Sequence, residues 1–366
     1  MELVQTVVTV FLFFLILGSL VVFHEIGHFV AARLAGVRVL EFGIGFPPRA
    51  RVIRSQGETL YTLNWLPIGG FVRLEGEDGD DGDDPRSFVN ARLPTKLVIL
   101  LAGVAMNLLA ALLIFTSIAW LATPLVGARI AGPIDAGSPA EQIGLRAGDG
   151  IRTIDGEAFE FYGRSLVEAL RDKAGETVTL EVDRAGGERE AIRVTLRPPE
   201  QIGPRVGPLG IGVPEAYFYG DYVGRDLPAA VGIGTTETIR WFGLILGGLG
   251  QIVGSFVSDP TAPPQAAGPV GIATQIGTVF FTAGPILTLY VAGILSANLA
   301  LVNALPFPPL DGGRILMIVL KAVFGRRISL RAERLTYVVG FVFLFAFLIW
   351  VTGFDIARGL GGSTTP

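Results

Sequence analysis

Two histidines and a glutamate lie within five residues of one another, in His24-Glu-Ile-Gly-His28. If the segment is helical, a spacing of four puts both imidazoles on one face, where they can bind the same metal ion. Glu25 then lies about 100° around the helix, beside the ion rather than on it. A glutamate in this place can take a proton from a zinc-bound water. We therefore expect a Zn²⁺ site with Glu25 as general base.

The surroundings of the motif favour a metal over a purely structural role. A five-residue pattern with two free positions also arises by chance. Here, however, His24 and His28 are the only histidines among 366 residues, and they follow the apolar run 4–23. Ionisable groups at the depth of a membrane span are costly without a partner, and a metal ion is such a partner.

The third protein ligand of such a site must be a carboxylate. A catalytic zinc usually has three protein ligands and one position for water, and the chain has neither cysteine nor a third histidine. Asp311 is the first candidate, because it follows a proline-rich stretch that ends an apolar helix. A helix-capping role at the membrane surface would also account for Asp311. Glu41, thirteen residues after His28, is the second candidate.

The composition is that of a membrane protein. Half of the residues are hydrophobic, only 17% are charged, and the net charge of −4 gives no sign of a nucleic-acid partner. The apolar stretches 4–23, 97–121, 284–305 and 337–351 each approach the length of a bilayer span. The first lacks a basic leader and a cleavage site, so we expect a retained helix rather than a signal peptide.

A fifth apolar stretch, 227–257, is rich in glycine and interrupted by polar residues, so it fits either a span or a helix on the membrane surface. Short β-prone pieces between the first two spans predict hairpins. Residues 127–199 have the composition of a soluble domain, with strands expected at 177–182 and 191–196 and a helix near 165–173.

These observations predict an α-helical membrane protein with about four transmembrane helices, a membrane-associated β-hairpin region and an inserted α+β domain. The expected order is a first transmembrane helix with the zinc motif (1–36), a hairpin and loop region on the cytoplasmic side (37–94), a second transmembrane helix (95–124), the inserted domain (127–199), a linker and membrane-surface amphipathic region (200–282), a third transmembrane helix (283–313), a basic cytoplasmic segment (314–335) and a fourth transmembrane helix (336–354).

Several motifs carry a resemblance to known proteins. The stretch Gly137-Ser-Pro-Ala-Glu-Gln-Ile-Gly-Leu-Arg-Ala-Gly-Asp149 resembles a bacterial PDZ domain, which implies a groove where a peptide adds as an extra strand. With His24-Glu-Ile-Gly-His28, Gly103-Val-Ala-Met-Asn107 and the segment 303–313, nearly the whole chain resembles the site-2 protease family, in its regulator-of-sigma-E branch. Val104 departs from that family, which commonly has proline there, and one PDZ-like unit is visible where some members have two.

The resemblance implies an intramembrane zinc metalloprotease that cuts transmembrane segments of other proteins. It implies that Asp311 is the third zinc ligand and that Asn303 lines the site. Asn107 and Asn303 would each hydrogen-bond substrate or tie two helices together. A membrane-dipping hairpin would hold the substrate as a strand, through Gly69, Gly70, Phe71 and Val72. Single-span membrane proteins, such as anti-sigma factors or remnant signal peptides, are the partners that the resemblance suggests.

A shared zinc ion would also fix the topology. If His24, His28 and Asp311 bind one ion, the first and third spans end at the same membrane face, and 227–257 cannot cross as well. Short basic loops face the cytoplasm. We therefore expect the active site towards the cytoplasm and residues 127–199 outside, because basic residues crowd the segment after the aspartate: Arg314, Lys321, Arg326, Arg327, Arg331 and Arg334. The resemblance to a bacterial branch implies that the membrane is the bacterial inner membrane.

Two other functions account for parts of the sequence. An inactive scaffold could bind partners through the PDZ-like domain and keep zinc only for structure, but such a site has no need of a base at Glu25. A channel or transporter could use buried polar residues as an ion path. The lack of an evident inverted repeat and the concentration of polar residues in one motif argue against transport.

Overall fold

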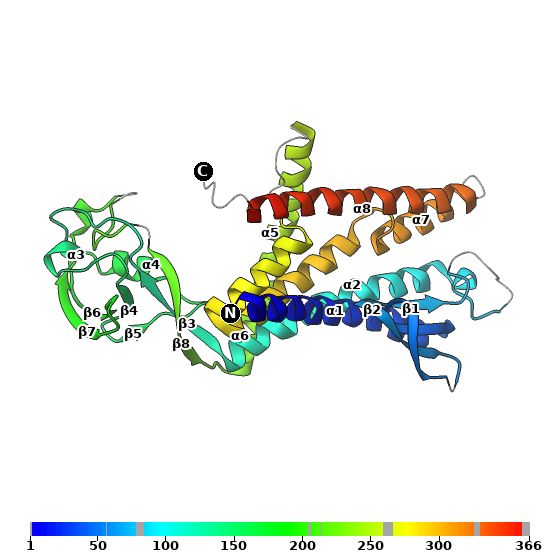
Figure 1. Cartoon of the computed structure of the whole chain (residues 1–366), viewed down its shortest axis with the longest axis horizontal. Coiled ribbons are helices and arrows are strands. Elements are labelled where there is room, and N and C mark those ends of the chain that lie inside the picture. The colour runs from blue at the N-terminus through cyan, green and yellow to red at the C-terminus, as the bar shows by residue number, and fades with distance from the viewer. Residues whose placement is uncertain are drawn as a thin grey trace. The chain divides into compact units, whose positions relative to one another are not determined.

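The computed structural model describes residues 2–55, 57–77, 84–203, 206–212, 214–258, 266–325 and 330–360. The chain forms two compact units, one of Met1–Phe115 with Gly234–Pro366 and one of Thr116–Ile233. Figure 1 shows long helices in the first unit and a strand-rich second unit.

Four helices of the described chain are long and apolar enough to cross a membrane, which confirms the predicted number. They are α1 (Glu2–Leu34), α2 (Leu93–Leu121), α6 (Pro269–Ala304) and the greater part of α8 (Leu330–Leu360). The third span begins earlier than predicted, at Pro269 rather than at 284. Gly284, with a φ of 83°, and Pro285 form a kink inside α6 where the sequence suggested a start.

Helix α5 (Leu227–Ser258) is continuous but is not among the four. It is held to α6 by polar side chains. The hydroxyl of Tyr290 donates a hydrogen bond to Oε2 of Glu237 at 2.6 Å, and Nε1 of Trp241 donates to the same hydroxyl at 2.7 Å. Buried polar groups need such partners. The placement of 227–257 on the membrane surface remains a prediction.

The segment after α6 is more helical than predicted. Helix α6 ends at Ala304, and α7 (Asp311–Phe324) begins at Asp311 itself, so the aspartate starts a new helix instead of closing the third span. The sequence suggested a loop here because prolines precede Asp311 and basic residues follow it. Residues 326–329 of the expected basic segment lie outside the described part of the chain.

Strands β1 (Val39–Arg54) and β2 (Leu60–Leu74) form the predicted hairpin region as a bent antiparallel sheet. The first half of β1 pairs with both ends of β2, since Phe42 is aligned with Val72 and also with Tyr61. A 3₁₀ turn, η1 (Phe88–Asn90), precedes α2. A buried cluster joins the sheet to α1 and α2: Ala32, Val37, Val39, Leu74, Phe88, Ile99 and Leu100.

The second unit is an antiparallel sheet with small helices. The sheet has the order β7-β6-β4-β3-β8, with β5 pairing beside β4. The bounds are β3 (Thr123–Arg129), β4 (Gly150–Ile154), β5 (Glu157–Ala158), β6 (Thr177–Asp183), β7 (Arg189–Thr195) and β8 (Glu215–Val223), with α3 (Pro139–Gln142), α4 (Leu166–Asp172) and η2 (Pro199–Gln201). Helix α4 and strands β6 and β7 lie where the sequence predicted a helix and two strands.

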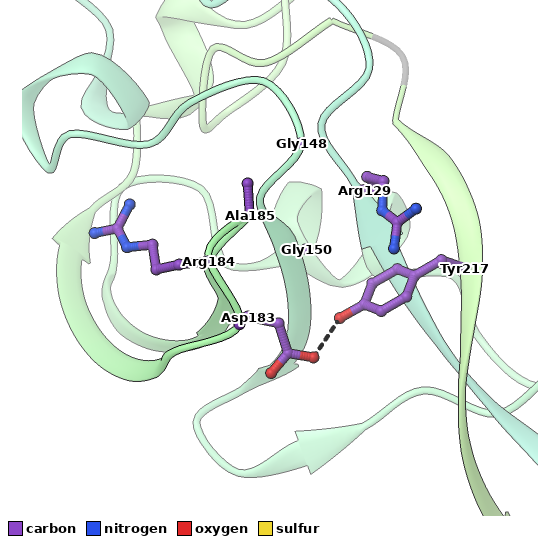
Figure 2. Close-up of a pocket in the computed structure, with 8 residues that line it drawn as sticks. Arg129, Gly148, Gly150, Asp183, Arg184, Ala185 and Tyr217 are labelled. Atoms are coloured by element: carbon purple, nitrogen blue, oxygen red, sulfur yellow. Dashed lines mark hydrogen bonds between the residues drawn. The ribbon is translucent and has the colours of Figure 1, made fainter.

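The folded unit extends beyond the predicted limit of 199, because β8 lies inside the expected linker and pairs with β3. Tyr217 of β8 covers two glycines, and a Cβ would lie 2.3 Å from its ring at Gly127 and 2.6 Å at Gly150. Its hydroxyl donates to Asp183 in the open pocket of Figure 2. Burial, together with this hydrogen bond, raises the pKa of Tyr217 above its usual range.

Candidate active site

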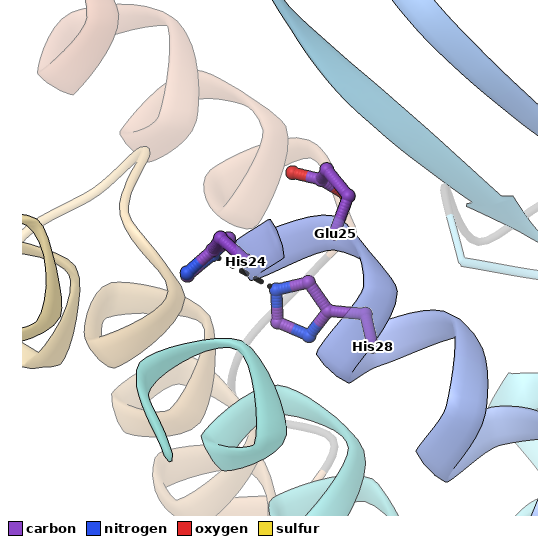
Figure 3. Close-up of side chains that lie close together, drawn as sticks. All are labelled: His24, Glu25 and His28. Atoms are coloured by element: carbon purple, nitrogen blue, oxygen red, sulfur yellow. Dashed lines mark hydrogen bonds between the residues drawn. The ribbon is translucent and has the colours of Figure 1, made fainter. Parts of the chain in front are cut away.

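Helix α1 carries the motif, and its geometry matches the expectation from the spacing. His24, Glu25 and His28 each offer a ligand atom, and these atoms lie within 4.8 Å of one another (Figure 3). The two Nε2 atoms are 3.1 Å apart. The histidines are only 6% and 8% exposed, whereas Glu25 is half-buried. Both imidazoles therefore converge on one point, and the glutamate lies at its margin.

Asp311 lies at the same point, although it is 287 positions after His24 in the sequence. Its Oδ2 lies 2.9 Å from Nε2 of His24 and 3.2 Å from Nε2 of His28. A tetrahedral zinc with bonds of about 2.0–2.1 Å separates its ligand atoms by about 3.3 Å. The three observed separations are close to that value, so these residues fit one zinc ion.

Two glycines after Asp311 allow α7 to begin close to the end of α6. A Cβ at Gly312 would lie 2.3 Å from the carbonyl oxygens of Ala304 and Leu305, and one at Gly313 would lie 2.5 Å from the backbone of Phe307. Real Cβ atoms do not approach backbone so closely. The glycines thus let the chain fold back and bring Asp311 to the histidines.

Helix α2 packs directly against the two histidines. Nδ1 of His28 lies 2.8 Å from the carbonyl oxygen of Ile99, and Nδ1 of His24 lies 3.3 Å from Nδ2 of Asn107. A Cβ at Gly103 would lie 2.4 Å from Nε2 of His28. In the sequence, Gly103 is recognisable only as part of a motif. Its contact with the histidines depends on how two distant helices pack.

The predicted substrate strand lies next to Glu25. A Cβ at Gly70 would lie 3.6 Å from Cγ of Glu25, and one at Gly69 would lie 3.0 Å from Val21 of α1. Gly69 has a φ of 71°, a conformation that favours glycine. Phe71 and Val72 continue the same strand. The glycines thus allow β2 to approach α1 beside the expected general base.

Asn303 lies in the last turn of α6. Among the described residues, no hydrogen bond joins its side chain to His24, His28 or Asp311. The structure therefore places Asn303 near the chain segment that leads to Asp311 without showing a contact with the histidines.

Glu41, the second candidate for third ligand, is held inside the sheet. It is 5% exposed, and its Oε1 accepts hydrogen bonds of 2.8 Å from the Thr62 hydroxyl and from Nη2 of Arg49. Arg73 lies 3.5 Å from its other oxygen. These partners satisfy the carboxylate where it is, so the geometry favours Asp311 as the ligand.

An ion pair connects α7 to the sheet. Arg314, one turn after Asp311, pairs with Glu77, and Glu77 also accepts a hydrogen bond of 3.2 Å from the backbone N–H of Leu74. In the sequence, Arg314 is only one of the basic charges that indicate topology. In the structure it ties the start of α7 to the end of β2.

Comparison with known proteins points to one group. The model of peptidase family M50 matches residues 12–347. "Zinc metalloprotease RasP" of Geobacillus kaustophilus is 28% identical, over 97% of this chain and 99% of its own length. RasP of Bacillus licheniformis is 28% identical over 96% and 99%. The "Probable membrane metalloprotease ARASP2, chloroplastic" of Arabidopsis thaliana is 29% identical over 87% and 73%.

Proposed function

The chain belongs to peptidase family M50, and we propose that this membrane-embedded zinc metalloprotease hydrolyses peptide bonds within or beside the transmembrane segments of other membrane proteins. The observation that carries the proposal is the meeting of Asp311 with both motif histidines. Three ligand atoms from two distant helices converge there, and a carboxylate lies beside them. A site of this kind leaves a position for water.

The residues divide the work of hydrolysis among them. His24, His28 and Asp311 would hold the zinc ion, which when bound polarises the substrate carbonyl and makes a bound water more acidic. Glu25 accepts a proton from the water molecule while the oxygen of that water bonds to the carbonyl carbon. The same carboxyl group then donates the proton to the amine nitrogen as the C–N bond breaks.

The edge of the sheet supports a role in presenting the substrate. A peptide bond in a membrane helix is protected by its own hydrogen bonds, so the helix must unwind before it can be cut. In β2, residues 70–74 pair with β1 along one side only, as far as the described residues show, and Gly70 lies beside Glu25. An unwound substrate segment would add to this edge as a strand, with Gly69, Gly70, Phe71 and Val72 as its partners.

The topology follows from the same ligand set. With His24 and Asp311 on one ion, the active site would face the cytoplasm, next to the basic residues that follow Asp311. The strand-rich unit Thr116–Ile233 would then lie on the outer side of a bacterial inner membrane. Its resemblance to a PDZ domain supports a role in selecting substrates, such as single-span proteins of the anti-sigma type or remnant signal peptides.

Cleavage of a model transmembrane peptide by the purified full-length chain tests the proposal. Wild-type protein should cut it, a zinc chelator should stop the reaction, and Glu25→Gln should lower the rate by about 10²–10⁴-fold while one zinc per chain is retained. An inactive scaffold would bind peptide without cutting it. Cleavage by Glu25→Gln at the wild-type rate would contradict the role of the glutamate.

A further inference from the structure

Three residues on one face of α2 contact the motif histidines. Ile99, Gly103 and Asn107 follow one another at intervals of four, so they lie along one side of the helix. The carbonyl of Ile99 faces Nδ1 of His28, and the side chain of Asn107 faces Nδ1 of His24. Gly103 between them leaves room for both rings. Each histidine thus has its Nδ1 against α2 and its Nε2 towards Asp311.

This arrangement determines where each ring must carry its hydrogen. A neutral imidazole that binds a metal through Nε2 has its hydrogen on Nδ1, and metal-bound histidines commonly donate it to a carbonyl or carboxylate. The carbonyl of Ile99 supplies such an acceptor for His28, at 2.8 Å. His24 needs an acceptor as well, and Asn107 is the residue that faces its Nδ1.

The amide of Asn107 has two orientations that differ only in which end faces the ring. In the structure Nδ2 lies 3.3 Å from Nδ1 of His24, and Oδ1 is buried without a partner among the described residues. A half-turn of the amide exchanges the two atoms. Either orientation leaves one buried end of the amide without a partner, so the protonation of the His24 ring determines which orientation is favoured. With Nε2 on the metal, Nδ1 offers a hydrogen, and only Oδ1 can accept it.

We infer that Asn107 is a positioning residue of the zinc site, whose Oδ1 accepts the Nδ1 hydrogen of His24 and holds Nε2 of that ring towards the ion. The inference rests on the proposed ligand set. It adds a third role to the two expected from the sequence, substrate contact and helix tie. The side chain of Asn107 is 0% exposed. The tie between α2 and α6 is made by the backbone carbonyl of Asn107, which accepts a hydrogen bond of 2.8 Å from the Ser296 hydroxyl.

Zinc affinity of the full-length protein in detergent, measured by competition with a chromophoric chelator, tests the inference. Asn107→Leu keeps the size of the side chain but removes the acceptor, and we expect zinc binding to weaken about 10–100-fold. Asn107→Asp keeps an oxygen towards Nδ1 and should bind zinc nearly as tightly as the wild type. Ser296→Ala, the control, removes the α6 tie and should leave zinc affinity unchanged.

The tautomer can also be observed directly, because the chain has only two histidines. In ¹⁵N-histidine-labelled, zinc-loaded protein, His24 should carry its hydrogen on Nδ1. In Asn107→Asp that proton should shift downfield, since a hydrogen bond to a carboxylate is stronger, while the signal of His28 stays in place. The comparison of Asn107→Asp with the wild type remains informative if Asn107→Leu does not fold.

The outcomes separate this inference from the function on which it rests. An Asn107→Leu protein that binds zinc like the wild type, or an Asn107→Asp protein in which the Nδ1 proton of His24 keeps its wild-type shift, would overturn the inference alone. A hydrogen on Nε2 of His24 would overturn the ligand set as well, because that nitrogen could not then bind zinc. The ligand set itself would be overturned if His24→Ala still bound one zinc per chain with wild-type affinity.

Discussion

The zinc site of the first unit and the sheet of the second are stabilised in different ways. At the zinc site, helices approach so closely that a Cβ at Gly27 would lie 2.3 Å from the carbonyl oxygen of Ala102. Polar atoms meet there at fixed positions. The second unit instead buries a continuous apolar cluster that includes Ile151, Ile154 and Leu180.

This difference separates function from folding. A membrane helix keeps its own backbone hydrogen bonds whatever its neighbours do, so small changes at helix contacts can displace ligands without unfolding the helices. A water-soluble sheet depends on the apolar area that it buries. We therefore expect substitutions near the histidines to affect zinc before stability, and substitutions in the sheet core to do the opposite.

The largest expected effect on zinc is loss of the third ligand. Asp311→Asn removes the charged oxygen that lies 2.9 and 3.2 Å from the two imidazoles, so zinc affinity should fall by more than the roughly 10–100-fold that losing an outer hydrogen-bond partner costs. Metal analysis after dialysis measures this. Glu41→Gln is the matched control and should retain zinc, and the reverse order would contradict both the ligand assignment and the topology.

A single methyl group at the helix contact should have the next largest effect. Gly103→Ala would place Cβ 2.4 Å from Nε2 of His28, so the ring must move, and we expect zinc affinity to fall about 10–100-fold with the helices still formed. Zinc titration with circular dichroism checks both parts. In the second unit, a Cβ at Gly186 would have no atom within 4 Å, so Gly186→Ala should change neither zinc affinity nor helix content. Wild-type zinc affinity in Gly103→Ala would show that α2 does not constrain the ligands.

In the second unit, the same kind of experiment should affect folding and leave the metal in place. Leu180 is fully buried, so Leu180→Ala should destabilise the unit by about 2–5 kcal/mol. Limited proteolysis should then cut residues 116–233 first, while zinc content stays at one ion per chain. Loss of zinc together with protection of this unit would contradict the separation of the two regions.

The sequence reveals those parts of the site that depend on local spacing or on the count of possible ligands. His24, Glu25 and His28 are visible because one helical turn relates them. The absence of cysteine and of a third histidine calls for a carboxylate as third ligand, and the proline-rich stretch before Asp311 makes this residue the first candidate, ahead of Glu41. Gly103 could not be recognised in this way, since its role depends on which face of α2 meets α1.

Boundaries were less predictable than elements for a similar reason. The sequence suggested that the third span starts at Gly284 and Pro285, but both lie within α6, where they form a kink. The sequence predicts a linker where β8 lies, because the pairing of β8 with β3 connects residues up to one hundred positions apart, as Thr123 with Val223. Local patterns do not report such pairing.

The smallest effect on the zinc site should come from removing the sheet of the second unit altogether. Thr123 and Val223 are partners in adjacent strands, so the ends of the segment between them lie only about 5 Å apart. Residues 124–222 can therefore be replaced by a short flexible linker without stretching α2 or α5. Because the metal residues all belong to the first unit, zinc content and cutting of a short model transmembrane peptide should persist.

Substrate choice should change instead. If the sheet screens the outer parts of substrates, the deleted protein should cut substrates with bulky outer domains faster than the full chain does. Paired assays on a short peptide and on the same peptide fused to a folded outer domain measure the ratio. A deleted form that binds zinc and is folded but cannot cut even the short peptide would show that the second unit helps to assemble the active site, and the contrast between the two regions would then fail.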